Sequence, residues 1–560
     1  MRPPAPSRRL PRPSGTLLLW GGVAAVLLWL VLYPNLFVLV DSFREGGQWT
    51  LEHYRRFAAS RSEREALWNS VWISLASVVL SAGIGVPLAF LFARRDFPGR
   101  RILGALAAMP VLLPPLVGTI SFLFLYGESG FLTRGVQALL GMERAPWRLS
   151  GAWAVLLVHA YTMYVYFYLF VAAGLARLDS GYAEAAAALG AGRWTTLRRV
   201  TLPMLAPALG GAGLLVFMTS MASFSAPYVF GGGFRVLTTQ LFNSKLNAED
   251  GMVAVEAVVL AVASLVFLLL LQRYESRREY TGAGKGLGPA PPAAGERGWL
   301  LALGAGALVG FLLLPHATVL LVSFVPEGTW TTQTLPPVYS TDSYVRLFTE
   351  PQRLVPVLNS LRMATVATVA NVIFAFAAAW LLARRRIPAR GVLSALVVLP
   401  WALPGTVLAV ALAYTFNVHR PLEGRFVLVG TFAILPLAYF IRNIPLVTRA
   451  ALASFQQLDP VLEEAAAALG ASRWTSARRV VLPLVLPGLA AGALLAFVTA
   501  LGEFVSSILL YTHRTRPISV EMLSQLRGFD FGGAAAYGVI LIVLVGLVFA
   551  SGYRNVGDGR

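Results

Sequence analysis

Long apolar stretches recur along this chain, and each is about as long as a helix needs to be to cross a lipid bilayer. Such a helix takes about 20 mostly apolar residues, because its backbone satisfies its own hydrogen bonds where water is absent. Residues of the set AVILMFWYC make up 57% of the chain and only 13% of its residues are charged. The bilayer is therefore the solvent for most of the chain. We count about twelve stretches, which run over Thr16–Val40, Leu67–Phe92, Ile102–Tyr126, Gly151–Gly174, Leu202–Ala222, Val253–Leu271, Trp299–Phe324, Val357–Leu382, Val392–Phe416, Phe426–Ala450, Leu482–Leu501 and Ala534–Ser551.

Basic residues cluster in the loops that follow the even-numbered stretches, for example in residues 94–101 and 384–390. Under the positive-inside rule this placement predicts that both termini are cytoplasmic. It also accounts for the net charge of +19 without a nucleic-acid partner, because the charges form no single stripe. No cysteine is present, which excludes a disulfide framework and a thiolate metal site. The sequence thus predicts an all-α, polytopic protein of a bacterial cytoplasmic (inner) membrane, with the lipid bilayer around its membrane-spanning helices.

The second half of the chain repeats the sequence pattern of the first half. Residues 184–195 recur at 464–475 with an offset of 280, and Asn69-Ser70 recurs as Asn359-Ser360 with an offset of 290. The register changes where the first half has the longer external loop, and loops tolerate such differences. We therefore predict two six-helix units, residues 1–272 and 299–560. The Gly- and Pro-rich residues 273–298 between them form a cytoplasmic linker.

The two halves match best in a segment between the fourth and fifth stretches of each half, near residues 179–203 and 459–483. Asp and Pro are favoured at helix starts, alanine has the highest helix propensity, and Gly190 and Gly470 stand where a left-handed residue ends a helix. The pattern predicts a short helix, a sharp turn and a second helix. We expect Trp194 and Trp474 to pack against the neighbouring helix.

Glu-Ala-Ala, three more residues and Gly resembles the EAA loop of binding-protein-dependent ABC importer permeases. In that family the loop inserts a coupling helix into the ATPase subunit. The resemblance covers nearly the whole chain and implies two six-helix permease repeats fused in one polypeptide. The coupling residues that it implies are Glu184, Ala185, Ala186, Gly190, Arg193, Glu464, Ala465, Ala466, Gly470 and Arg473.

The resemblance also implies partners. Two ABC ATPase subunits would bind at the cytoplasmic face, and a periplasmic or lipid-anchored solute-binding protein at the external face. ATP and Mg²⁺ would belong to the ATPase, so this chain would bind no cofactor and would not be an enzyme by itself. Fused double units resemble the importers of ferric iron, thiamine, polyamines and phosphonates. The stretch Phe224–Gly233 fits this group, and ferric iron is the substrate we expect first.

Polar residues inside apolar stretches mark candidate pathway positions, because their burial in a bilayer is costly. We single out Glu256, Glu503, Tyr537 and Asn371. An interhelical hydrogen bond without solute contact is the structural alternative for each. The five histidines never stand at metal-ligand spacing with a carboxylate, so no metal site is predicted.

Two other classes of protein compete with an importer subunit. An ion-coupled secondary transporter also has about twelve spans in two related halves, with Glu256 as its ion site. It has no use for a duplicated Glu-Ala-Ala loop on one face. A membrane enzyme would need a nucleophile with its base, paired carboxylates or a metal cluster, and the sequence contains none at a suitable spacing.

Overall fold

The structure is a computed structural model, and it describes residues 15–276, 293–294, 298–330, 333–385, 387–417 and 427–557. Most of the predicted linker therefore lies outside the described residues. The helices of the first half are α1 (Gly15–Leu27), α2 (Tyr33–Asp41), α3 (Glu52–Ala59), α4 (Arg61–Arg94), α5 (Arg100–Ala107), α6 (Pro115–Tyr126), α7 (Phe131–Leu139), α8 (Ala152–Leu175), α9 (Ser180–Ala188), α10 (Arg193–Thr196), α11 (Leu202–Met204), α12 (Ala206–Met221), α13 (Ser225–Phe230), α14 (Leu237–Leu246) and α15 (Asp250–Ser276).

The second half repeats this order. Its helices are α16 (Gly298–Val322), α17 (Asp342–Thr349), α18 (Pro351–Arg384), α19 (Arg390–Ala402), α20 (Gly405–Thr415), α21 (Ile434–Gln457), α22 (Val461–Ala468), α23 (Arg473–Ser476), α24 (Leu482–Leu501), α25 (Val505–Leu510), α26 (Ile518–Arg527) and α27 (Phe531–Gly557). Short π or 3-10 turns are η1 (Leu28–Leu32), η2 (Met109–Leu112), η3 (Leu197–Thr201), η4 (Ala477–Val481) and η5 (His513–Thr515). The strands are β1 (Arg44–Glu45), β2 (Gln48–Trp49), β3 (Arg95–Asp96) and β4 (Ala293–Ala294).

Among the described residues, nine helices are long and apolar enough to cross a membrane, or eleven when two bent helix pairs are each counted as one span. The all-α prediction is confirmed. The remaining predicted stretch, Phe426–Ala450, overlaps α21, which forms a helix of 24 residues but is less apolar because it carries Arg442 and Arg449.

Prolines break the predicted third and ninth stretches. Pro114 separates η2 from α6, and Pro404 separates α19 from α20 with a bend of 106°. A proline has no backbone N–H to donate, and it disfavours the helical conformation of the residue before it. Each of these stretches is therefore two half-helices.

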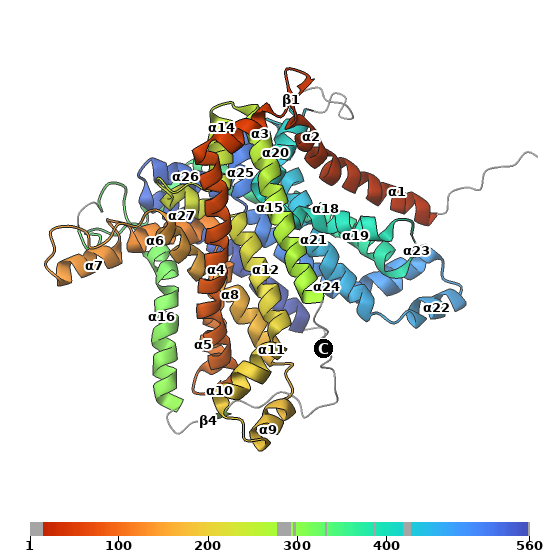
Figure 1. Ribbon diagram of the computed structural model, residues 1–560, viewed down its shortest axis with the longest axis horizontal. Helices are drawn as coiled ribbons and strands as arrows, with labels where there is room; N and C mark the ends of the chain where they lie inside the picture. Colours follow the sequence, from red (N-terminus) through yellow and green to blue (C-terminus); the bar gives the residue numbers. More distant parts are fainter. Residues whose placement is uncertain are drawn as a thin grey trace, which may run out of the picture.

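The first helix of each half packs against the other half (Figure 1). Helices α1 and α2 lie along α18 and α20, while α16 lies along α5 and α6. Ring contacts and hydrogen bonds join these segments, including Trp29 with Phe416 and the Tyr161 hydroxyl with the Leu312 carbonyl at 2.7 Å. The two halves are thus interlocked and share one large apolar core.

Candidate coupling loops and translocation path

The two Glu-Ala-Ala segments form the predicted helix, turn and helix. Asp179 caps α9 by accepting from the Gly181 amide, and Asp459 accepts from the Val461 amide at the start of α22. The glycines that end these helices have φ of +80° at Gly190 and +83° at Gly470, where a side chain would be strained. The left-handed turn expected at both glycines is confirmed.

The tips of both loops are apolar and exposed. Leu189 and Leu469 are 89% and 90% exposed, and Trp194 and Trp474 are 71% and 74% exposed. The expectation that the tryptophans pack against a neighbouring helix is wrong, because each α10-type helix starts just after the glycine turn and projects from the bundle. Matching apolar groups at the same place in both halves are typical of a surface that binds a partner. Sequence reasoning missed both leucines, since each follows the alanine run without a break in pattern.

The charged groups of the loops are arranged differently in the two halves. Glu184 and Glu464 are exposed and make no ion pair with a described residue. Their neighbour Glu463 pairs with Arg384 at 3.1 Å, and Arg384 also donates to the Leu458 carbonyl at 2.5 Å. The first half has Ala183 where the second has Glu463. Glu463 therefore links the second loop to the end of α18, and Ala183 cannot form the equivalent ion pair in the first loop. Helix α9 contains Ala185 and Ala186, and α22 contains the equivalent Ala465 and Ala466. Arg193 is exposed at the start of α10, and Arg473 is the first residue of α23.

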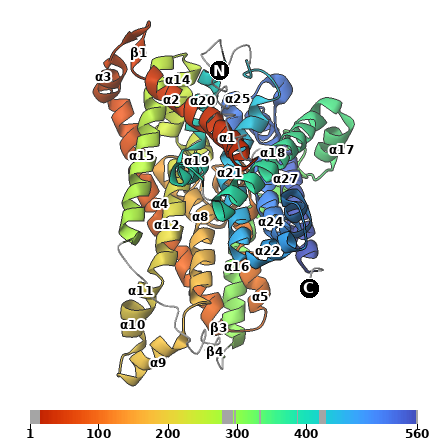
Figure 2. The same ribbon diagram turned by 90° about the vertical axis from the view of Figure 1, so that its right-hand side faces the viewer.

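The coupling loops lie apart from each other, at the ends of two diverging sets of helices (Figures 1 and 2). Besides the packing of α1, α2 and α16, the two halves meet at the end that carries α14 and α25. There the rings of Phe224 and Phe504 lie 5.8 Å apart, and Lys245 Nζ donates to the Leu509 carbonyl at 2.7 Å. The Tyr414 hydroxyl donates to Asp250 at 2.7 Å across the same seam. The described contacts thus close the molecule on the side away from the coupling loops.

Lys245 belongs to α14, outside the membrane-spanning helices. Burial lowers the pKa of its ammonium group to about 8, and Asp250 nearby acts in the opposite direction. Leu526 stands at the corresponding place in the second half, with an offset of 281. Of these two equivalent positions, only the one in the first half therefore carries a titratable ammonium group.

The four predicted pathway residues do not come together. Glu256 is fully buried and accepts from Ser244 at 2.7 Å, and Tyr537 is buried and donates to the Arg353 carbonyl at 2.5 Å. Asn371 is buried inside α18, where it donates to the Ala367 carbonyl. Each of these contacts lies within one half. Only Glu503 stands at a break between helices, in the segment that joins α24 to α25.

Glu256 has an acidic neighbour that sequence reasoning missed. Glu63 lies close to Glu256, accepts from Gln240 at 2.7 Å and is 5% exposed. The two carboxyl groups interact with each other, and one oxygen of each contacts no other polar group among the described residues. The corresponding residue of the second half is Arg353, at an offset of 290, and it forms an ion pair with Asp530 at 3.5 Å. Equivalent positions of the two halves thus carry opposite charges, a carboxylate in the first half and a guanidinium in the second.

The breaks near Phe224 and Phe504 are supported by different polar groups. In the first half, His159 Nδ1 lies 3.0 Å from Ser77 and 3.1 Å from Ser220, while its Nε2 lies 2.8 Å from Ser223. This is a neutral network around one imidazole.

In the second half the same region is charged. Arg442 lies 3.6 Å from Glu503 and donates to the Leu403 carbonyl at 3.3 Å, beside the bend between α19 and α20. Tyr439, which corresponds to His159, contacts Ser507 at 2.7 Å. Sequence reasoning named Glu503 but missed Arg442, although an arginine inside an otherwise apolar stretch was a usable signal.

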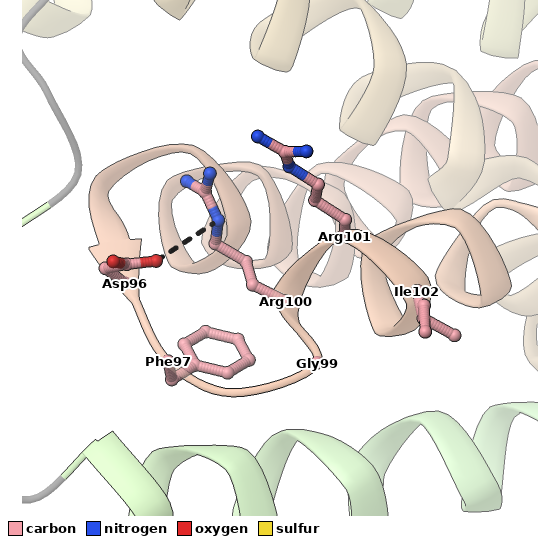
Figure 3. Close-up of a pocket in the computed structure, with 6 residues that line it drawn as sticks. All are labelled: Asp96, Phe97, Gly99, Arg100, Arg101 and Ile102. Carbon is pink, nitrogen blue, oxygen red and sulfur yellow. Dashed lines mark ion pairs between the residues drawn. The ribbon is translucent and has the colours of Figure 1, made fainter.

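A cavity of about 500 Å³ lies at the loop between α4 and α5 (Figure 3). Figure 3 shows the side chains of Arg100 and Arg101 extending to the same side of this loop, with Arg100 3.8 Å from Asp96. Next to it β3 pairs with β4, so that Arg95 lies opposite Ala293. The cavity is a feature of the basic loop and lies outside the helix breaks. Its lining residues are Asp96, Phe97, Gly99, Arg100, Arg101 and Ile102.

The chain belongs to the family described as binding-protein-dependent transport system inner membrane component, which matches residues 85–280 and 371–558. Two copies of one permease domain therefore follow each other in this polypeptide. The chain is a multi-pass inner-membrane permease of an ABC importer, a transport component without catalytic activity of its own. Membership in this family sets aside the ion-coupled carrier.

Several relatives show how far the likeness extends. The chain is 31% identical to a probable ABC transporter permease, y4fN, of Sinorhizobium fredii, over 93% of this chain and 92% of that protein. It is 25% identical to the ferric transport system permease FbpB of Actinobacillus pleuropneumoniae, over 96% of this chain and 78% of the relative. The sulfate transport system permease CysT of Escherichia coli is 33% identical over 47% of this chain and 94% of its own length.

Proposed function

We propose that this chain forms the whole transmembrane path of an importer and is driven by two ATPase subunits, one docked on each coupling loop. Both termini would be cytoplasmic, and ATP and Mg²⁺ would be held by the ATPases. The exposed Leu189, Trp194, Leu469 and Trp474 support this docking role, because apolar tips at equivalent places suit equivalent partner clefts.

The geometry supports a mechanism of alternating access. The halves are joined beside Phe224 and Phe504 and diverge toward the coupling loops. ATP-driven closure of the ATPase pair would bring α9 and α22 together, separate the seam at α14 and α25 and admit solute from the external binding protein. The structure would then correspond to the resting, inward-facing state.

The observation that carries the substrate proposal is the length of the match to FbpB, which spans both halves of this chain. Ferric iron is the substrate we propose. A second candidate is an oxyanion such as sulfate, because one permease of that function matches at 33% identity and the second half carries arginines along α21.

The coupling role is tested with the double variant Glu184→Ala, Glu464→Ala. We expect the chain to keep its fold but to lose co-purification with its ATPase and the ATP hydrolysis that the binding protein stimulates, because both exposed carboxylates are removed from the docking surface. Glu143→Ala is the matched control, since Glu143 is also exposed but lies in an external loop. Unchanged ATPase association and stimulated hydrolysis in the double variant would reject the docking role.

The substrate is tested by uptake into proteoliposomes that contain the chain, its ATPase and its binding protein. Ferric citrate and sulfate are offered separately as labelled probes. ATP-dependent accumulation of iron supports the first proposal, and accumulation of sulfate alone replaces it with the second.

A further inference from the structure

Helices α8 and α21 occupy equivalent places in the two halves and leave equivalent faces incompletely buried. Along α8 the residues 162, 166 and 169 are accessible while those between them are buried, and along α21 the same holds for 442, 446 and 449. The spacing of four and three residues places each set on one helix face. Both helices run through the middle of the molecule (Figures 1 and 2).

The chemistry of these two faces differs. The α8 face carries Thr162, Tyr166 and Leu169, and is neutral. The α21 face carries two arginines, Arg442 and Arg449, separated by Leu446. Arg442 is 27% exposed and Arg449 is exposed with its guanidinium 5.8 Å from the Trp401 ring. Two arginines seven residues apart on one face are about 10 Å apart along the helix axis.

Helix α21 is equivalent to the membrane-spanning helix α8. An arginine inside such a helix is costly in contact with lipid, so it faces the protein interior or a water-filled path. Arg442 and Arg449 are each eight residues from an end of α21, well inside its length. Arg442 has a partial counter-ion in Glu503 at 3.6 Å, which is itself 14% exposed. Arg449 makes no ion pair with a described residue. The exposed face of α21 therefore has more positive charge than its surroundings neutralise.

We propose that the α21 face lines the translocation path as its anion-binding side, with Arg442 next to the closed seam and Arg449 further toward the coupling loops. The solute then passes as an anion, either a free oxyanion or a ferric ion held by oxyanionic ligands, which both present the same negatively charged oxygens to guanidinium groups. This inference rests on the proposed function, since it assumes that the chain forms the path, and it narrows the class of solute.

The location of Glu503 fits this role. It lies at the break between α24 and α25, beside the seam at Phe504, and its carboxylate accepts from the Ser506 amide at 2.9 Å. A carboxylate therefore already pairs with Arg442 in the closed state. An anionic solute would replace Glu503 as the partner of Arg442 once the seam opens, whereas a cationic solute would be repelled by both arginines.

The test uses the complete transporter in proteoliposomes, with labelled ferric citrate, sulfate and molybdate as anionic probes and thiamine and spermidine as cationic ones. The key variant is Arg449→Gln, because no ion pair with a described residue is broken by it. We expect uptake of the transported anion to fall about tenfold, as for the loss of one charge-assisted contact. Arg449→Lys should restore uptake to within about threefold of the unaltered protein, because lysine keeps the charge.

Leu169→Gln is the matched control, at the equivalent exposed position of α8, and should leave uptake within about twofold. Arg442→Gln combined with Glu503→Gln removes the partly buried ion pair without leaving one charge alone. We expect this double variant to lose anion uptake while its unfolding temperature stays close to that of the unaltered protein.

Several outcomes would overturn the proposal. One is that Arg449→Gln behaves like Leu169→Gln, and another is that Arg449→Lys is no better than Arg449→Gln. Uptake of thiamine or spermidine in place of every anion would also do so. ATPase co-purification and basal hydrolysis are measured in each variant, so that a failure of coupling, which the Glu184 and Glu464 variants report, is distinguished from a failure of anion binding.

Discussion

The coupling loops are nearly identical in sequence between the two halves, whereas the helices that precede them, α8 and α21, differ in chemistry. Residues 184–195 and 464–475 differ at few positions and make the same glycine turn, whereas α8 and α21 share a pattern of burial but differ in charge. His159 faces three serines where Tyr439 contacts one, and Thr162 stands where Arg442 pairs with Glu503. Surfaces that would dock equivalent ATPase subunits are repeated, and surfaces that would meet one asymmetric solute are not.

We expect the largest difference in stability between the halves for substitutions at His159 and at the equivalent Tyr439. His159→Ala removes a buried imidazole with contacts to Ser77, Ser220 and Ser223, so we expect a loss of about 3 kcal/mol in the free energy of unfolding. Tyr439→Phe removes only the contact with Ser507 and should cost about 1 kcal/mol. Thermal unfolding in detergent measures both. Equal losses would mean that the two regions do not differ in the way their contacts indicate.

Lys245 should make the stability of the protein depend on pH, whereas the equivalent Leu526 of the second half cannot. The folded-state pKa of about 8 lies below the ordinary value of 10.5, so between these pH values the unfolded chain binds more protons. Stability should therefore rise with pH across this window, by at most about 1.4 kcal/mol per pH unit. Unfolding temperatures measured from pH 7 to 10 test this. Lys245→Met should flatten the rise, and an unchanged slope in that variant would assign the pH dependence to another group.

The smallest expected effect concerns the tie on the second coupling loop. Glu463→Gln weakens an ion pair with Arg384 that is partly exposed and not aligned as a hydrogen bond, so its loss should cost about 0.5–1 kcal/mol locally. Amide exchange should then speed up in residues 459–481 and stay unchanged in residues 179–201, which serve as the internal control. Faster exchange in both loops would show that the tie does not act on one loop alone.

Much of this architecture could be predicted from local sequence. Runs of apolar residues and the alanine-rich segment after Asp179 depend on the properties of neighbouring residues, and Gly190 marked a left-handed turn that the structure contains. The proline breaks at Pro114 and Pro404 were also readable, because they remove local hydrogen bonds. The exposure of Trp194 could not be predicted, since it depends on how far α10 projects from the bundle.

The sequence by itself determined that this is an all-α membrane protein with two related halves and a duplicated Glu-Ala-Ala loop, because length, hydropathy and spacing act over short segments. Only the tertiary structure decided that α1 and α16 each pack against the other half. It also decided that Lys245 donates to the Leu509 carbonyl and that Arg442 pairs with Glu503. These contacts join residues from about 60 to more than 250 positions apart in the chain. Their formation depends on how the helices cross in three dimensions, which no local pattern specifies.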